Sequence, residues 1–237
     1  MGEELNVIYG VYFICCINNY LDVVKEQLAM LRMGLLQRTQ KVIVFVTRYN
    51  HDECSELDDI LNSYDKFIII KTPDNSYERY AINNYKKHIA EKNYYLYYFH
   101  TKGLKRKDDP LINVFTSRRQ ILNYYTLLQY NLNIQLLEEY DAVGCSIHLY
   151  PKKHFSGNFW WSKSSYLHVL EDINDKYLSP EMYVLSGNNC NYISLAQDTN
   201  NIQVDKYKFP TESVIKGNLT SKCIVIEDHK KLITMCE

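Results

Sequence analysis

The chain lacks the features that mark a membrane protein or a general nucleic-acid binder. No apolar run in its 237 residues is long enough to span a bilayer. Its first four residues, MGEE, are acidic where a secretion signal would be basic. The formal net charge is −1, which gives no general attraction to nucleic acid or anionic lipid. We therefore expect a cytoplasmic protein in which any phosphate-binding site is local.

Paired cysteines and the common nucleotide-binding glycine motifs are also missing. None of the 7 cysteines forms a CxxC pair, and several lie within apolar runs. This pattern predicts reduced, mostly buried thiols rather than disulfides or a metal site. The sequence contains no GxxxxGK[ST] and no GxGxxG, which disfavours a P-loop enzyme or a dinucleotide-binding enzyme.

Buried strands and amphipathic helices alternate through the first half of the chain. Apolar, β-branched and aromatic runs predict four strands, at 6–16, 41–47, 67–71 and 94–99. Helical patterns separate them, at about 21–35, in a short stretch that carries Leu57, Ile60 and Leu61, and at 76–91. This alternation predicts an α/β fold with a mostly parallel central sheet flanked by helices, like one half of a nucleotide-binding domain.

The second half is less regular. We expect a long helix over 113–139, a strand over 141–149, a helix from 162 and a short strand over 222–227. No linker or repeat divides the chain, so we expect one domain over 1–237. Its nucleotide-binding half would be 1–103 and its acceptor-binding half 104–237.

A polar tetrapeptide, His100-Thr101-Lys102-Gly103, follows the aromatic strand 94–99 directly. In open α/β sheets, ligands bind at the carboxyl ends of the strands. Lys102 is a point charge suited to phosphate, and Gly103 would let the backbone approach a ligand closely. His100 could bind a metal, donate to phosphate or contact an acceptor. We interpret this segment as an active-site loop; the alternative is a surface turn capped by His100.

Other charged residues are candidates for chemistry. Glu181 follows Pro180 at a predicted helix start and could act as a general base. Asp109 is a second candidate base, although its basic neighbours at 105–107 also fit a salt-bridged loop. Arg48, just beyond the second strand, could reach a nucleotide or lie on the surface. Within Arg118-Arg119, one arginine could reach phosphate.

The aromatic segment 154–161 could face a sugar. Aromatic rings pack against sugar C–H surfaces, Ser and Asn bond hydroxyls, and glycine permits close approach. Core packing is the alternative, and we favour it for Phe159. Trp160 and Trp161 point to opposite sides of an extended chain, so only one of them could face a ligand.

The order of these motifs resembles the rhamnan-synthesis-F-like glycosyltransferase family, especially its small HTKG-bearing relatives in bacteria and large DNA viruses. The shared elements are HTKG after a strand, a basic loop, a long helix, YDAVG at 140–144 and SGNFWWSKS at 156–164. The resemblance is firmest over 94–170 and only topological over 6–91.

The resemblance implies a GT-A-like, Rossmann-related fold and transfer of a sugar from a nucleotide-diphosphate donor to a glycan or other hydroxyl acceptor. It also implies a role in polysaccharide biosynthesis, in the host cytoplasm if the protein is viral. Many nucleotide-sugar transferases hold Mn²⁺ or Mg²⁺ with an Asp-x-Asp motif, which HTK replaces here, so a metal would fall to His100. The donor-diphosphate residues would be His100, Thr101, Lys102 and Gly103. The sugar or acceptor residues would be Ser156, Gly157, Asn158 and Trp160.

The expected reaction is attack of an acceptor hydroxyl on the donor's anomeric carbon, while Lys102, with or without a metal, stabilises the departing diphosphate. In an inverting reaction Glu181 or Asp109 would take the proton, and a retaining reaction would need no such base. Two alternatives stay open. One is another nucleotide-dependent transferase, and the other is a non-catalytic nucleotide- or glycan-binding module.

Overall fold

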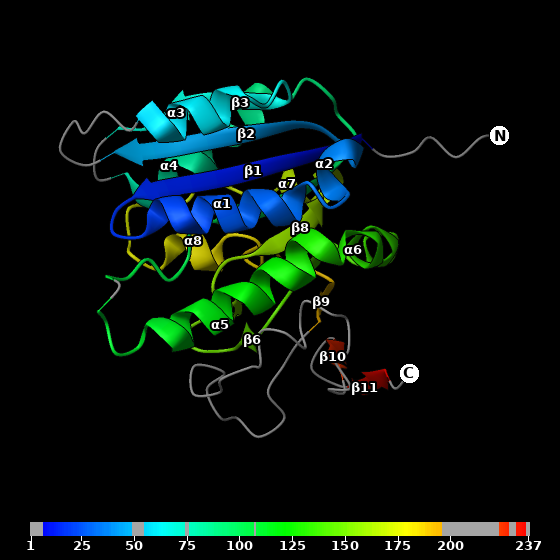
Figure 1. Ribbon diagram of the computed structural model, residues 1–237. Helices are drawn as coiled ribbons and strands as arrows, with labels where there is room; N and C mark the ends of the chain where they lie inside the picture. The colour runs from blue at the N-terminus through cyan, green and yellow to red at the C-terminus, as the bar shows by residue number, and fades with distance from the viewer. Residues whose placement is uncertain are drawn as a thin grey trace.

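The computed structural model describes residues 7–48, 55–73, 76–106 and 108–195, and the backbone of two strands at 223–227 and 231–235. One sheet of nine strands crosses the molecule in the order β11-β10-β9-β5-β8-β4-β1-β2-β3 (Figure 1). Its strands are β1 (Val7–Cys16), β2 (Thr39–Arg48), β3 (Phe67–Lys71), β4 (Tyr94–His100), β5 (Ala142–Gly144), β8 (Trp160–Lys163), β9 (Tyr192–Ser194), β10 (Cys223–Glu227) and β11 (Lys231–Met235). A separate hairpin pairs β6 (Ile147–His148) with β7 (His154–Phe155).

The fold class predicted from the sequence is confirmed. Strands β3, β2, β1 and β4 are parallel neighbours. Only β8 and β10 run antiparallel to the other seven of the nine described strands. The result is a Rossmann-related, GT-A-like α/β sheet in which both halves of the chain contribute strands.

Helices cover both faces of this sheet, which explains why β1 and β4 read as unbroken apolar runs. The helical elements are α1 (Tyr20–Leu31), α2 (Leu35–Arg38), α3 (Ser55–Asn62), α4 (Tyr77–Asn84), η1 (Tyr85–His88), α5 (Ile112–Asn123), η2 (Tyr124–Leu128), α6 (Tyr130–Leu136), α7 (Ser164–Leu167) and α8 (Ser179–Met182). Among the described residues, each helix is too short or too polar to cross a membrane.

Strand β4 shows how the two faces are built. All seven of its residues are buried. Tyr95, Tyr97 and Phe99 point to the face covered by α1 and α5, and the intervening Leu96 and Tyr98 point to the face covered by α4. The aromatic run therefore fills both cores at once, and it delivers the residues that follow it to the carboxyl edge of the sheet.

Two predicted elements are interrupted. The helix expected over 113–139 is split by a π-helical turn, η2, between α5 and α6. The strand expected over 141–149 ends at Gly144, and Ser146 then takes a positive φ of 54° before β6 begins. The chain turns there to form the β6–β7 hairpin, so the aromatic segment after it enters the sheet as β8.

The order of strands reverses between β1 and β4. From β1 the chain moves outward through β2 and β3 (Figure 1). It then returns to the other side of β1 as β4. Loops that leave neighbouring strands in opposite directions open a crevice at the carboxyl edge. The HTKG segment leaves β4 at this switch point.

Candidate functional site

Thr101 of the HTKG segment is hydrogen-bonded to the carboxyl end of β1. The amide of Thr101 donates to the carbonyl of Phe13 at 3.0 Å, and the amide of Cys15 donates to Oγ1 of Thr101 at 2.9 Å. His100 and Thr101 are each only 5% exposed. These two residues therefore belong to the interior of the switch point and not to a surface turn.

Gly103 is required by a close approach to helix α5. Its φ is +69°, and a Cβ at this position would lie 3.0 Å from Cβ of Phe115 and 3.1 Å from its carbonyl oxygen. Side chains other than glycine rarely adopt this backbone conformation. The sequence suggested that Gly103 makes room for a ligand; in the structure it makes room for α5.

His100 is held by acceptors at both ring nitrogens. Its Nδ1 lies 3.0 Å from Oε1 of Glu78, and its Nε2 lies 2.9 Å from the carbonyl oxygen of Gly157. A carbonyl and a carboxylate only accept, so both bonds form when both nitrogens carry protons. A metal ligand needs a free lone pair on one nitrogen. The expectation that His100 binds a metal is therefore corrected: its imidazole is a donor in a buried network.

Glu78, in the first turn of α4, is the hub of that network. Its Oε2 accepts from the hydroxyl of Tyr98 at 3.0 Å and from Nδ2 of Asn158 at 2.6 Å. The indole N–H of Trp160 donates to Oδ1 of Asn158 at 3.0 Å, which turns the amide nitrogen toward the carboxylate. The carboxylate thus receives hydrogen bonds from β4 and from the loop before β8.

The electrostatics of Glu78 follow from these partners. Burial alone would raise the pKa of the carboxyl, but the charge and hydrogen bond of His100, the charge of Lys102 and the bond from Asn158 together lower the pKa to about 2. Glu78 is therefore a carboxylate at physiological pH and a poor general base. No motif in the sequence marks Glu78; its only sequence signal is an acid in the first turn of a helix that packs beside the switch point.

Lys102 lies beside Glu181, a residue of α8 that is distant from it in the sequence. The Nζ of Lys102 lies 3.7 Å from Oε1 of Glu181, and both side chains are about one-quarter exposed, at 26% and 25%. Oε2 of Glu181 lies 4.0 Å from Nε2 of His154. Nδ1 of His154 lies 2.8 Å from the carbonyl oxygen of Lys152, to which it must donate. Two residues singled out from the sequence, Lys102 and Glu181, thus lie together at the edge of the site.

Buried side chains from α1 and α5 hold the carbonyls of the HTKG backbone. Arg119 is 3% exposed, and its guanidinium donates two hydrogen bonds, of 3.1 and 2.9 Å, to the carboxylate of Glu26. Its third contact is a 3.2 Å bond to the carbonyl of Lys102. Gln27 donates to the carbonyl of His100 at 2.9 Å. Arg119 is thus committed to supporting the loop, and Arg118 is the arginine nearer to the edge of the site.

The segment 156–160 lines this network from the other side. Ser156 accepts a hydrogen bond from Arg118, and Gly157 presents its carbonyl to His100 from a turn with φ +97°. Trp160 is 1% exposed and stacks on Tyr98, with ring centroids 5.3 Å apart. We expected Trp160 to face a sugar; instead its ring is covered, and it positions Asn158. Trp161 points into the opposite core, as strand alternation requires.

Asp109 and Arg48 have local partners. Asp109 forms an ion pair with Lys105 at 3.5 Å and accepts a hydrogen bond from the amide of Leu111 at 2.8 Å. These contacts agree with a salt-bridged loop, the alternative to a catalytic base at this position. Arg48 ends β2 opposite Cys16 of β1 and forms an ion pair with Asp58 of α3. Arg48 therefore lies on the same edge of the sheet as His100, but two strands away from β4.

The donor set does not fit the divalent cation suggested by the resemblance. Within the described ranges, no three His, Cys, Asp or Glu side chains are grouped as metal ligands. Both nitrogens of His100 are engaged, and Glu78 is surrounded by donors. The groups here that could face an anion are the cations Lys102 and Arg118.

No protein-family model matches the chain, and no curated protein matches it. Among solved structures, it is similar to 4-diphosphocytidyl-2C-methyl-D-erythritol synthase from Anaerococcus prevotii, with 12% sequence identity and a TM-score of 0.45. The match covers 90% of this chain and 95% of that one. A likeness at this level supports no functional argument, so function has to be argued from the site.

Proposed function

We propose that the protein is a nucleotide-dependent transferase, and more specifically a glycosyltransferase that moves a sugar from a nucleotide-diphosphate donor to a hydroxyl of a glycan or other acceptor. The observation that carries the proposal is the Lys102–Glu181 pair at the carboxyl edge of the switch point. The resemblance of the HTKG and SGNFWW segments to the rhamnan-synthesis-F-like family supports the choice of sugar transfer.

Lys102 is suited to exchange partners when a donor binds. Its 3.7 Å separation from Glu181 is longer than a charge-assisted hydrogen bond, and both groups are partly exposed, so the pair is easily broken. A diphosphate offers the ammonium group more negative charge than one carboxylate does. In this proposal, Lys102 turns to the diphosphate and stabilises the charge that develops as the bond between the anomeric carbon and the phosphate oxygen breaks.

Glu181 gains a role from the same exchange. Once Lys102 leaves it, its carboxylate can accept the proton of the acceptor hydroxyl as that oxygen forms a bond to the anomeric carbon. The nucleoside diphosphate leaves with the electron pair of the broken bond. This assignment makes the reaction inverting, and it prefers Glu181 to Asp109, whose carboxylate is engaged within its own loop.

The supporting residues keep Lys102 in place without taking part in bond changes. Arg119 and Gln27 hold the carbonyls of Lys102 and His100, and the His100–Glu78 pair closes the interior side of the loop. A catalytic ammonium group needs such a rigid base, because an error of about 1 Å in position can lower a rate by about 10²-fold.

A non-catalytic binding module is the second candidate. It is favoured by one observation, the absence of a metal-ligating cluster among the residues that the structure describes. Such a module would bind nucleotide or glycan through the same cations without turning over a donor. The two functions therefore differ in turnover and not in binding.

The test is donor hydrolysis and transfer with UDP-, GDP- and TDP-sugars, with and without manganese, together with calorimetric binding of the free diphosphates. We expect release of nucleoside diphosphate with at least one donor, and a fall of about 10²–10³-fold in kcat for Lys102→Ala, as for loss of a donor to a developing anion. Glu181→Gln should lower kcat while leaving diphosphate affinity near the wild-type value.

A matched control is Lys25→Ala, which removes the lysine of another Lys–Glu pair, the exposed Lys25–Glu56 pair between α1 and α3. It should leave turnover and binding unchanged. Wild-type turnover in Lys102→Ala would refute the mechanism. Binding of diphosphate with no turnover of any donor would favour the binding module, and a protein that binds neither nucleotide nor glycan would overturn both.

A further inference from the structure

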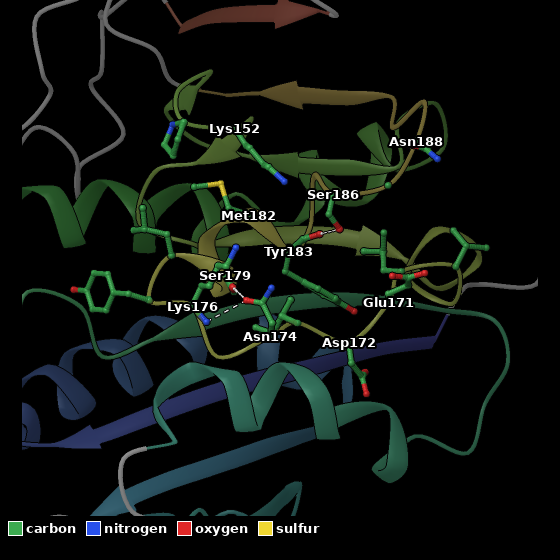
Figure 2. A pocket seen from close by; sticks show the side chains of 17 residues that line it. Lys152, Glu171, Asp172, Asn174, Lys176, Ser179, Met182, Tyr183, Ser186 and Asn188 are labelled. Atoms are coloured by element: carbon green, nitrogen blue, oxygen red, sulfur yellow. Dashed lines mark hydrogen bonds between the residues drawn. The ribbon is translucent and has the colours of Figure 1, made fainter.

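A cavity of about 920 Å³ lies beside α8, in the part of the chain that links β8 to β9 (Figure 2). It is lined by segments 169–174, 176–179, 182–183 and 186–188, and by Pro151 and Lys152. Its volume is in the range of small-molecule sites, about 300–1,000 Å³, but it is open to solvent, because most of the residues that line it are exposed. The Lys102 site is not part of its lining, so the cavity needs an explanation of its own.

The cavity and the Lys102 site share one wall. Ser179 and Met182 of α8 face the cavity, whereas Glu181, on the same helical turn, faces Lys102. Lys152 forms a second link, because its side chain lines the cavity while its carbonyl holds His154 beside Glu181. A molecule that fills the cavity and extends past α8 would therefore end near the carboxylate of Glu181.

The charges of the lining cancel. Its ionisable side chains with charge at neutral pH are Lys152, Lys176, Glu171 and Asp172, two of each sign (Figure 2). A site for a nucleotide polyphosphate would need an excess of positive charge. The balance instead fits an uncharged ligand that both donates and accepts hydrogen bonds, as sugar hydroxyls do.

Apolar and aromatic surface is exposed around the same cavity. Tyr177 is 88% exposed and Val169 72% exposed, and both line it; Tyr150, next to Pro151, is 87% exposed. Tyrosine combines a flat apolar face with a polar tip, so the exposed ring of Tyr177 can pack against a sugar while its hydroxyl stays in water. Exposed serine and asparagine side chains also line it, including Asn174 and Ser186, whose hydrogen bonds are drawn in Figure 2.

We propose that this cavity is the acceptor subsite and that it binds a short, uncharged oligosaccharide. The role of this saccharide as an acceptor rests on the proposed sugar transfer, but the binding of a neutral saccharide in the cavity does not. The ligand packs a pyranose face on Tyr177, forms hydrogen bonds with the balanced polar lining, and directs one terminal hydroxyl past α8 toward Glu181.

The experiment measures saccharide binding by saturation-transfer NMR and by titration, with no nucleotide present. The probes are neutral di- and trisaccharides of glucose, galactose, mannose, N-acetylglucosamine and rhamnose, and matched saccharides that carry uronate or sulfate groups. We expect a neutral member to bind and its charged counterparts to bind more weakly. Tyr177→Ala should lower its affinity by about tenfold, the effect of losing one aromatic contact.

Two further variants keep the test decisive. Tyr177→Phe keeps the aromatic ring and should keep most of the saccharide affinity. Met33→Ala removes an apolar side chain that is 70% exposed but does not line the cavity, so this variant should bind the saccharide as the wild type does. Diphosphate affinity should stay at the wild-type value in all three variants, because Lys102 is untouched.

The outcomes separate the two proposals. If Lys102-dependent diphosphate binding is seen but no neutral saccharide binds, or if Tyr177→Ala binds as well as the wild type, the cavity proposal is overturned and the proposed function stands. Preference for the charged saccharides also overturns it. If a neutral saccharide binds in a Tyr177-dependent manner but no nucleotide binds, the cavity is a glycan site and the proposed function fails.

Discussion

Replacing Glu78 by glutamine would test whether the buried network is a true ion pair. The substitution keeps the size of the side chain but removes its charge. Three groups donate hydrogen bonds to the carboxylate of Glu78, from His100, Tyr98 and Asn158. The amide nitrogen of glutamine would face at least one of these donors and could not accept its hydrogen bond. The exposed fraction of the Glu78 side chain is 19%, so water replaces little of what is lost. We expect a clear loss of stability that depends on pH.

The sign and size of this dependence follow from the pKa of Glu78. The folded state lowers the pKa from 4.5 to about 2, so the carboxylate stabilises the fold fully above pH 4.5 and loses that contribution as the pH falls toward 2. The shift corresponds to about 3 kcal/mol at neutral pH, of which about 2 kcal/mol is lost by pH 3. A loss of about 3 kcal/mol would lower the Tm by about 6–12 °C in a domain of this size.

The assay is urea unfolding at pH 7 and at pH 3, followed by the fluorescence of Trp160 and Trp161, which are both 1% exposed in the fold. Glu78→Gln should be much less stable than the wild type at pH 7, and the gap should shrink by about 2 kcal/mol at pH 3. Glu56→Gln, in an exposed ion pair, should show no such gap. An equal gap at both pH values would refute the ion pair.

Four further substitutions probe the HTKG loop and the side chains around it. Gly103→Ala forces a Cβ against α5 at φ +69° and should destabilise the protein by about 1–3 kcal/mol in denaturant titrations; an unchanged midpoint would contradict this. Trp160→Phe and Trp161→Phe each remove one buried indole hydrogen bond, but only Trp160→Phe should weaken the pH-dependent contribution described above. Arg119→Lys should weaken diphosphate binding in calorimetry, because a lysine cannot hold its glutamate partner and the loop carbonyl together, and wild-type affinity would argue against a positioning role.

The sequence predicts the fold well where one local pattern decides the structure. The run 94–99 is apolar because both faces of β4 are covered, and the structure confirms the strand, extended to His100. The pattern at 113–139 predicts one long helix. The π-helical turn within it adds a single residue to one turn, and this changes the spacing of the apolar residues too little to be detected in the sequence. The short strand expected near 222–227 matches β10.

The site was predictable only in part, because its partners come from distant segments. HTKG could be located by its position after a buried strand. Whether His100 binds a metal or a carboxylate depends on Glu78 and Gly157, which only the packing of α4 and the loop before β8 brings to it. Nothing local distinguishes Glu78 from any acid in the first turn of a helix. Trp160 was misread for a related reason: its residue type suits a sugar platform, but burial against Tyr98 covers its ring.

The contacts that Glu78 and Glu181 make with a basic side chain differ in length and in burial. His100–Glu78 is 3.0 Å long with side chains 7% and 19% exposed, whereas Lys102–Glu181 is 3.7 Å long with side chains about one-quarter exposed. Breaking a buried pair by removing one partner costs about 3–5 kcal/mol, and an exposed pair contributes about 0–1 kcal/mol. A ligand can therefore rearrange the second pair far more cheaply than the first. In the proposed function, therefore, His100 supports the site despite its position at the strand end, and Lys102 is the group that meets the donor's diphosphate.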